Sequence, residues 1–297
     1  MLLRCAAAAS NLSMRLMGAR RVRREIPPAS IVLYRLGPPE GEPWLLLHGM
    51  GSIAGSWVRV LGALRRDCRL LVPELSNLGG SRVPGGGIGV ANAADYLGRL
   101  LEAELGDLSG MGGRTRPVTV VGLSLGGWMA VRLALARPDL VARLVLVDAG
   151  GYRHQDWDRI QQLVAVADLA DVDRLYGQMF VRAPWVLRRS RPGFLRAYSS
   201  PGVRRVLTDT TEADTFEDAD LARLTMPTAL IWGEHDGLFQ LATARAMAAA
   251  LPQASLEVIP DCGHAVHLEC PERLAAALQR FRRSTALPVP LARRETA

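Results

Sequence analysis

The sequence predicts an α/β fold, in which a mostly parallel, doubly wound sheet carries helices on both faces and an inserted helical cap. From about residue 30, short apolar runs alternate with amphipathic stretches, the pattern of strands connected by helices. This alternation stops over residues 151–222 and then resumes. The chain has 297 residues, 49% of them hydrophobic, which is enough for one large core with an insertion.

Seven short apolar segments account for the predicted sheet. We expect strands at residues 30–35, 44–48, 69–73, 118–121, 144–147, 228–232 and 255–259. Their runs of leucine and β-branched residues are typical of parallel strands that are buried on both faces. Apolar residues recur at helical spacing over residues 90–105, so this connection is predicted to be a helix with one buried face.

The inserted segment differs from the rest of the chain. Residues 151–222 are rich in Arg and Asp, carry several aromatic residues, and contain no run that fits a strand. We therefore expect a helical cap that returns to the sheet at Met226 and Pro227. The predicted organisation is a poorly ordered N-terminal tail (1–29), a core (30–150 and 223–283), a cap (151–222) and a C-terminal tail (284–297).

The charge of the chain favours a small-molecule partner over a polymeric one. The formal net charge is +7, but all basic residues are Arg, a bias that a GC-rich coding sequence explains without nucleic-acid binding. The clusters at residues 20–24 and 188–191 leave polyanion binding as an alternative. No apolar run has the roughly 18 residues needed to cross a bilayer. We expect no stable membrane insertion, no nucleic-acid partner and a cytoplasmic location; the oligomeric state stays open.

Residues 1–24 contain many Arg residues and no acidic residue. A targeting peptide, a disordered tail and a start-site error, with Met14 or Met17 as the true start, are the three interpretations left open. The four cysteines (Cys5, Cys68, Cys262 and Cys270) lack the spacing of a metal site, so we expect free thiols, no metal and no cofactor.

The strongest chemical signal surrounds Ser124. This serine lies in the run Gly122-Leu123-Ser124-Leu125-Gly126, between a short apolar strand and a predicted helix. A sharp turn between strand and helix exposes the serine hydroxyl, and glycines two residues to either side remove side chains that would collide there. We therefore expect Ser124 to be a nucleophile, with a plain glycine-rich turn as the alternative.

A second glycine-rich turn, His48-Gly49-Met50-Gly51, directly follows a predicted buried strand. Its glycines let the backbone approach a ligand closely, so the N–H groups of Met50 and Leu125 are predicted to form an oxyanion hole. A plain glycine turn is the alternative. For His48 itself, bracing the loop is favoured over catalysis.

Two later strands end in the residues that a serine nucleophile requires. Asp236 follows the strand at 228–232 and His264 follows the strand at 255–259. A histidine base and a carboxylate that fixes its tautomer would complete a catalytic triad in the order Ser, Asp, His. Glu234, Asp261 and Asp148 remain alternative acids. We expect His267 to be a rim or structural residue, and His235 and His154 to face solvent.

These segments together resemble the α/β-hydrolase superfamily, in particular its small capped members: esterases, haloperoxidase-like enzymes and carbon–carbon bond hydrolases. The resemblance covers residues 30–283. It rests on Leu47 to Gly51 with Trp57, Pro73-Glu74 through Gly79-Gly80-Ser81, the turn at Ser124, Trp232 to Asp236, and Gly263-His264 through Glu269-Cys270-Pro271-Glu272. It implies the same roles for Ser124, Asp236 and His264.

The sequence also departs from that family's pattern. Leu123 stands where His is frequent, residues 74–77 replace the usual Asp-x-Pro-Gly, and Ala265 stands where carbon–carbon bond hydrolases commonly have Trp. A serine at the turn argues against haloalkane dehalogenase and epoxide hydrolase chemistry, which require a carboxylate nucleophile.

We therefore expect a serine hydrolase of the carboxylesterase type, acting on a small apolar acyl or aryl substrate through an acyl-enzyme. Carbon–carbon bond hydrolysis, thioester hydrolysis and lactone hydrolysis are alternatives that use the same triad. A binding protein without turnover would lack a triad residue, and none is missing. The expected substrate pocket residues are Trp57, Trp128, Phe180 and Trp185.

Overall fold

The computed structural model describes residues 12–106 and 115–285. Most of the predicted C-terminal tail and residues 1–11 of the N-terminal one, including Cys5, lie outside these ranges. Among the described helices, none is long and apolar enough to cross a membrane.

The described chain contains one sheet of eight strands. In chain order, the strands are β1 (Arg20–Ile26), β2 (Ala29–Leu36), β3 (Glu42–Leu47), β4 (Cys68–Pro73), β5 (Val118–Leu123), β6 (Val141–Val147), β7 (Thr228–Gly233) and β8 (Ala254–Ile259). In space they follow the order β1-β2-β4-β3-β5-β6-β7-β8. The seven predicted strands are all present, with small differences in their ends.

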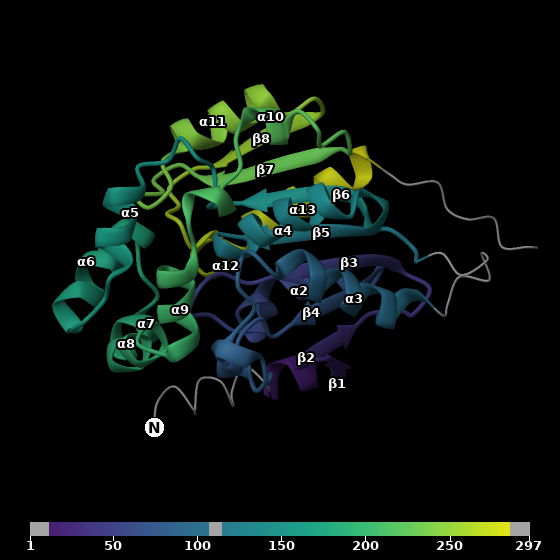
Figure 1. Cartoon of the computed structure of the whole chain (residues 1–297), viewed down its shortest axis with the longest axis horizontal. Helices are drawn as coiled ribbons and strands as arrows, with labels where there is room; N and C mark the ends of the chain where they lie inside the picture. The colour runs from purple at the N-terminus through teal and green to yellow at the C-terminus, as the bar shows by residue number, and fades with distance from the viewer. Residues whose placement is uncertain (1–11, 107–114, 286–297) are drawn as a thin grey trace, which may run out of the picture.

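Strand direction determines where the functional side chains gather. β1 pairs with β2, and β2 with β4, in antiparallel orientation, whereas the pairs from β4 through β8 are parallel. In the register of the central strands, Leu47 lies opposite Gly122 and Leu123 lies opposite Val147. The carboxyl ends of β3, β5, β6, β7 and β8 therefore meet at one edge of the sheet (Figure 1).

Strand β1 differs from the predicted organisation, because the sequence analysis placed residues 20–26 in a poorly ordered tail. Its Arg-rich run lacks the apolar alternation of a buried strand, yet it pairs along its whole length with β2. Arg24 and Arg35 of the neighbouring strand both bind the buried carboxylate of Glu104. Backbone pairing and this charge cluster hold an edge strand whose side chains are mostly exposed.

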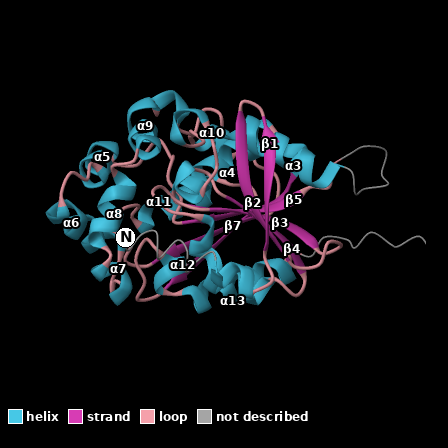
Figure 2. Cartoon of the chain, turned by 90° about the horizontal axis from the view of Figure 1, so that it is seen from below, coloured by secondary structure: helices cyan, strands magenta, loops and turns pink. Residues whose placement is uncertain are grey.

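Helices cover both faces of the sheet (Figure 2). The α-helices are α2 (Val58–Leu64), α3 (Ala93–Leu105), α4 (Leu125–Ala136), α5 (Trp157–Val164), α6 (Leu169–Met179), α7 (Trp185–Arg189), α8 (Arg191–Tyr198), α9 (Pro201–Asp209), α10 (Asp218–Leu221), α11 (Leu241–Ala250), α12 (Val266–Glu269) and α13 (Pro271–Ser284). Residues 12–16 are also helical. Short 3-10 turns are η1 (Ala54–Trp57), η2 (Asn77–Gly79), η3 (Pro84–Gly86), η5 (Pro138–Leu140) and η6 (Glu212–Asp214).

Two apolar cores lie on opposite faces of the sheet. Helices α2 and α13 pack together over one face, and their core includes Trp44 and Leu278. Helices α3, α4 and α11 cover the other face, where the core includes Leu101 and Met129. Burial of the sheet on both sides explains why its central strands are continuous apolar runs.

The segment between β6 and β7 is helical, as expected for the cap. Helices α5 to α9 lie together beside the carboxyl edge of the sheet (Figure 1). Helix α10, which the sequence analysis included in the cap, instead packs against α11 of the core. The inserted part that covers the site therefore ends before residue 218.

Candidate active site

Ser124 lies in a sharp turn between β5 and α4. Its backbone angles, φ 54° and ψ −119°, are in a region that residues other than glycine rarely adopt. The turn is held from behind, because the Ser124 N–H donates to the carbonyl of Val147 at 3.0 Å, and the Ser124 carbonyl accepts the N–H of Gly127 at 2.9 Å. The hydroxyl is presented at the carboxyl edge of the sheet, at the amino end of α4.

The glycines around this turn are required by close backbone contacts. A Cβ atom on Gly122 would lie 2.3 Å from the carbonyl oxygen of Gly126, and one on Gly126 would lie 2.4 Å from that of Leu47. Both distances are far below a normal van der Waals contact. The close packing of this strained turn therefore explains the glycines of the sequence motif, as predicted.

Asp236 and His264 lie at the ends of neighbouring strands and bond to each other. Asp236 Oδ2 is 2.9 Å from His264 Nδ1, and both side chains are buried. Asp236 Oδ1 accepts the backbone N–H groups of Leu238 and Phe239, each at 2.8 Å. The carboxylate is thus fixed on both oxygens, and a proton on Nδ1 leaves Nε2 free to act as a base.

Two of the alternative acids lie elsewhere. Glu234 and Asp261 are exposed, and Glu234 accepts the backbone N–H of Asp261 at 3.2 Å. His235 is exposed beside Glu234, with 3.7 Å between its Nε2 and the carboxylate. These side chains form a surface cluster in which neither carboxylate bonds to His264.

Asp148 is the alternative acid that lies close to the site. It is fully buried after β6 at a φ of 43°, and its Oδ1 accepts the Gly233 N–H at 2.8 Å. Burial and the nearby Asp236 carboxylate raise the pKa of Asp148 well above its ordinary value. A neutral carboxylic acid beside a carboxylate is the arrangement expected of two acids that share one buried space.

Two groups in the described residues have the composition of a metal site. Ligand atoms of Asp148, Asp236 and His264 lie within 4.8 Å of one another, as do those of Glu234, His235 and Asp261. In the first group, Asp236 and His264 already bond to each other, and Asp148 has a raised pKa. Both observations fit a hydrogen-bonded acid and base better than a set of metal ligands.

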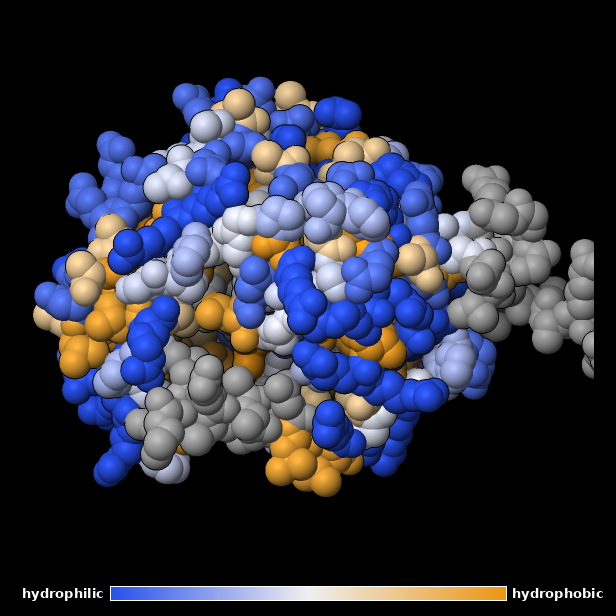
Figure 3. Space-filling view, turned by 60° about the horizontal axis from the view of Figure 1, so that its bottom comes forward, coloured by the Kyte–Doolittle hydropathy of each residue, from blue (hydrophilic) through white to orange (hydrophobic). Residues whose placement is uncertain are grey.

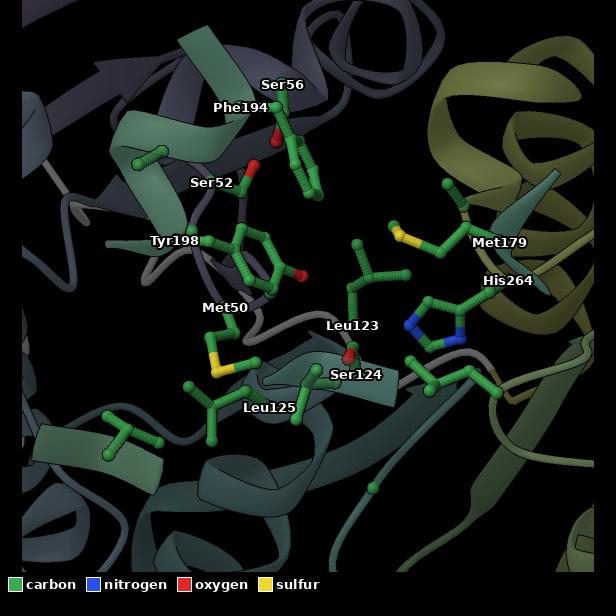
Figure 4. A pocket seen from close by; sticks show the side chains of 18 of the residues that line it. Met50, Ser52, Ser56, Leu123, Ser124, Leu125, Met179, Phe194, Tyr198 and His264 are labelled. Carbon is green, nitrogen blue, oxygen red and sulfur yellow. The ribbon is translucent and has the colours of Figure 1, made fainter. Parts of the chain in front are cut away.

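The turn after β3 packs directly against the serine. A Cβ atom on Gly49 would lie 3.3 Å from Cβ of Ser124, so the residue at this position must be very small. Gly51 has a φ of 66°, and the ring of Tyr198 from α8 covers it. Met50 and Leu125 lie beside the serine in the same cavity (Figure 4).

His48 braces this turn, as the sequence analysis favoured. Its Nδ1 lies 2.9 Å from the carbonyl of Gly49, and its Nε2 accepts the N–H of Leu75 at 3.1 Å. Burial lowers the pKa of His48 to about 4, so the ring is a neutral donor and acceptor. Glu74 holds the chain just after this turn, because its carboxylate accepts the N–H of Ala54 at 3.0 Å. Burial raises the pKa of the Glu74 carboxyl to about 7.

A cavity of about 820 Å³ opens beside Ser124 and His264. It lies between the sheet edge and the cap, and apolar side chains from both line it, among them Met179, Phe194 and Tyr198 (Figure 4). Phe194 and Tyr198 stack with ring centroids 4.3 Å apart. Figure 3 shows apolar side chains gathered toward the cap end of the molecule.

The four expected pocket residues divide into two pairs. Trp128 and Phe180 line the cavity. Trp57 does not, because it is fully buried in the core beneath α2 and α13. Trp185 does not either, because its side chain is 71% exposed on the outer side of α7, while the adjacent Val186 and Leu187 face the cavity.

Several cavity residues were missed as pocket residues by sequence reasoning. Tyr198 and Phe194 belong to a helix whose facing direction depends on the packing of the cap. His267 was expected at the rim or in a structural role, but it is buried and lines the cavity. Its spacing of three residues from His264, on a short helix, was the available signal. Cys262, two residues before His264, is buried in the core, and burial raises the pKa of its thiol.

Known proteins share this architecture. The sequence matches the model of the alpha/beta hydrolase family over residues 44–277. Carboxylesterase CesB from Bacillus subtilis has the same fold, with a TM-score of 0.76 and 18% identity; the match covers 94% of this chain and 98% of that one.

Curated relatives are similar over most of their length. One is the 2-hydroxymuconate semialdehyde hydrolase of Pseudomonas putida, which is 27% identical over 82% of this chain and 87% of its own. Another is the pimeloyl-[acyl-carrier protein] methyl ester esterase of Nitrosomonas europaea, 28% identical over 84% of this chain and 98% of its own. The extent of the family match, across both halves of the core and the segment between them, shows that this chain belongs to the alpha/beta hydrolase family.

Proposed function

We propose that the protein hydrolyses a carboxylic ester through an acyl-enzyme formed on Ser124. The observation that carries this proposal is the bond between Asp236 and His264 at the wall of the cavity that also exposes Ser124. Figure 4 supports it, because the imidazole of His264 lies toward the serine hydroxyl. This arrangement supplies a nucleophile, a base and a group that orients the base.

In the first half of the reaction, Nε2 of His264 takes the proton of Ser124 Oγ as that oxygen attacks the ester carbonyl carbon. The tetrahedral intermediate then breaks its bond to the alcohol oxygen, which leaves with the proton from His264. In the second half, a water molecule gives a proton to His264 and attacks the acyl-enzyme. The carboxylic acid leaves, and the proton returns to Ser124.

The N–H groups of Met50 and Leu125 are proposed to bind the oxyanion of each intermediate. Leu125 is the first residue of α4, where backbone N–H groups have no partner within the helix and the helix dipole favours negative charge. The turn that holds Met50 packs closely against Ser124 at Gly49, which supports the Met50 N–H as the second donor. Removing one such donor typically costs about 10²–10³ in turnover.

The substrate is proposed to be a small molecule with an apolar acyl or aryl group. The cavity volume of about 820 Å³ exceeds what an acetyl ester would fill, and its walls carry aromatic and methionine side chains. The similarity to a methyl ester esterase supports the ester class.

Turnover of a panel of substrates tests the proposal. The panel contains 4-nitrophenyl esters of increasing acyl length, matched thioesters, lactones and a vinylogous diketone acid, each assayed with the wild type and with Ser124→Ala. We expect ester hydrolysis with a preference for acyl chains longer than acetyl, and a loss of roughly 10³-fold or more in the variant. Ester turnover that is equal in the two proteins would refute it.

Carbon–carbon bond hydrolysis is the second candidate. It is supported by the similarity to a 2-hydroxymuconate semialdehyde hydrolase, whose named substrate carries a carboxylate, and by Arg196, which lines the cavity. Two results together would favour carbon–carbon bond hydrolysis over ester hydrolysis. The wild type would cleave the diketone acid faster than the esters, and Arg196→Leu would lose the diketone cleavage but keep its ester turnover.

A further inference from the structure

His267 is a buried polar side chain that the proposed chemistry does not use. It lies on α12, one turn beyond His264, and only 4% of its surface is exposed. Neither of its ring nitrogens has a hydrogen-bond partner among the described residues. Yet the residue lines the cavity that holds Ser124.

A second unpartnered polar group lies on the element beside it. Ser56 belongs to η1, which packs against α12, and it also lines the cavity. Its hydroxyl oxygen is buried and has no hydrogen-bond partner in the described part of the chain. The ring of Trp57 packs against the imidazole of His267, with ring centroids 5.5 Å apart at an angle of 49°.

The cost of leaving these groups unpaired points to a ligand. A buried donor or acceptor without a partner destabilises the folded protein, and an apolar residue at either position would avoid that cost. Both groups are found at the wall of one cavity, between η1 and α12. Here a bound molecule, or water in its place, can supply the missing hydrogen bonds.

The charge state of His267 narrows the chemistry of that molecule. Burial, together with the nearby His264 and His48, lowers the pKa of His267 to about 3, so the ring is neutral at physiological pH. A neutral imidazole offers one N–H donor and one acceptor nitrogen, and a serine hydroxyl offers both functions. Leu268, next to His267 in the chain, and Val58, two residues after Ser56, also line the cavity and carry no charge.

We propose that His267 and Ser56 form a subsite that hydrogen-bonds an uncharged oxygen group of the substrate, either a hydroxyl or a keto oxygen on an otherwise apolar chain. This inference rests on the proposed function for the identity of the reacting bond, and it narrows the substrate class to hydroxy or keto esters. An apolar chain fills the rest of the cavity, and the oxygen group sets its position.

Matched pairs of esters test the subsite. Each pair consists of a 4-nitrophenyl alkanoate and the same ester with one keto or hydroxyl group, placed in turn along the chain. For the best position, the wild type is expected to favour the oxygenated ester in kcat/KM. In His267→Leu and in Ser56→Ala, the ratio of kcat/KM for the oxygenated ester to kcat/KM for the plain alkanoate falls roughly ten- to a hundredfold.

The plain alkanoate is the folding and catalysis control within each variant. His154→Leu is the matched control, because it removes an exposed histidine that packs on Tyr152 and does not line the cavity. His267→Asn, which keeps a donor and an acceptor, is expected to restore part of the preference. A wild type without preference at any position, or an equal loss for both members of the pair in His267→Leu, would overturn the subsite.

Binding separates failure of the subsite from failure of the proposed function. Calorimetry with Ser124→Ala measures the affinity for the same ester pairs without turnover. We expect the oxygenated ester to bind more tightly, and the added His267→Leu change to abolish the difference. If the wild type hydrolyses no ester but this difference is seen, the subsite stands and the proposed reaction fails. Equal affinities with and without His267 overturn the subsite alone.

Discussion

The carboxylate of Asp236 bonds on one side to Nδ1 of His264, at 2.9 Å, and on the other to two backbone N–H groups of its own loop. Because both oxygens are engaged, the carboxylate holds the imidazole in a single orientation and tautomer. The position of the base thus depends on one buried hydrogen bond at the ends of β7 and β8.

Asp236→Asn is therefore expected to reduce kcat strongly. An amide in this position can donate to Nδ1 and stabilise the wrong tautomer, so we expect a loss of roughly 10²–10⁴-fold. Steady-state kinetics with the best ester of the panel measures it. Glu234→Gln is the matched control, since Glu234 is an exposed acid two residues away, and it is expected to stay within a few-fold of wild type. Equal losses in the two variants would contradict this assignment.

The Asp148→Asn substitution is expected to change kcat and the free energy of unfolding only slightly. Burial first and then Asp236 raise the pKa of Asp148 well above its ordinary value, which favours the neutral acid, and Asn has the same shape as that acid. Asn also tolerates the φ of 43°. We expect kcat within about tenfold of wild type and a change of under about 1 kcal/mol in the free energy of unfolding.

Asp148→Ala is the contrasting change at the same position. It leaves the Gly233 N–H without its acceptor and opens a small cavity, so we expect a loss of about 2–4 kcal/mol in the free energy of unfolding. Urea unfolding measures both variants. If Asp148→Asn reduced kcat as much as Asp236→Asn, Asp148 would have to act as the ionised acid.

Gly126→Ala is expected to destabilise the protein by several kcal/mol. Its new Cβ would lie 2.4 Å from the carbonyl oxygen of Leu47, a backbone atom in a buried strand that cannot move away cheaply. Urea unfolding measures the change. Gly177→Ala in α6 is the control, because a Cβ there meets nothing within 4 Å, and the helix should gain roughly 0.5–1 kcal/mol. Similar effects at both glycines would contradict the packing argument.

Glu74→Gln is expected to make stability less dependent on pH. The pKa of Glu74 is raised from 4.5 to about 7 by burial, so between these values the folded protein keeps a proton that the unfolded chain has released. The free energy of unfolding therefore falls as pH rises through this window, by at most about 3 kcal/mol from this group.

Urea unfolding between about pH 5 and about pH 8 measures this effect. The wild type should lose more stability than Glu74→Gln across the window. His48, whose pKa is lowered to about 4, acts in the opposite direction and loses stability as pH falls, but it is present in both proteins and cancels in the comparison. Parallel pH profiles would show that Glu74 does not titrate as described.

The sequence predicted those parts of the molecule that local rules determine. Buried parallel strands are apolar along their length, and a strained turn such as the one at Ser124 needs glycines that are visible as a motif. The positions of Asp236 and His264 followed from strand ends, because parallel strands bring their carboxyl ends to one edge of the sheet.

Features that depend on packing between distant segments were not predictable in this way. Strand β1 has no apolar alternation and is held by pairing with β2 and by the buried Glu104. Trp57 follows the turn after β3 in sequence, but η1 directs its ring into the core. Trp185 and Phe180 lie five residues apart in the cap, and only its folded shape decides which of them faces the cavity.

Ser124, rather than another serine of the cavity, is proposed to be the nucleophile. Ser52, Ser56 and Ser190 also line this cavity, so the chain itself offers three alternatives. The most direct measurement is reaction of the purified protein with a fluorophosphonate, followed by peptide mapping of the adduct by mass spectrometry. We predict one adduct, on Ser124, that is absent in Ser124→Ala and retained in Ser52→Ala, Ser56→Ala and Ser190→Ala. An adduct on Ser52, Ser56 or Ser190, or labelling that persists in Ser124→Ala, would contradict the account.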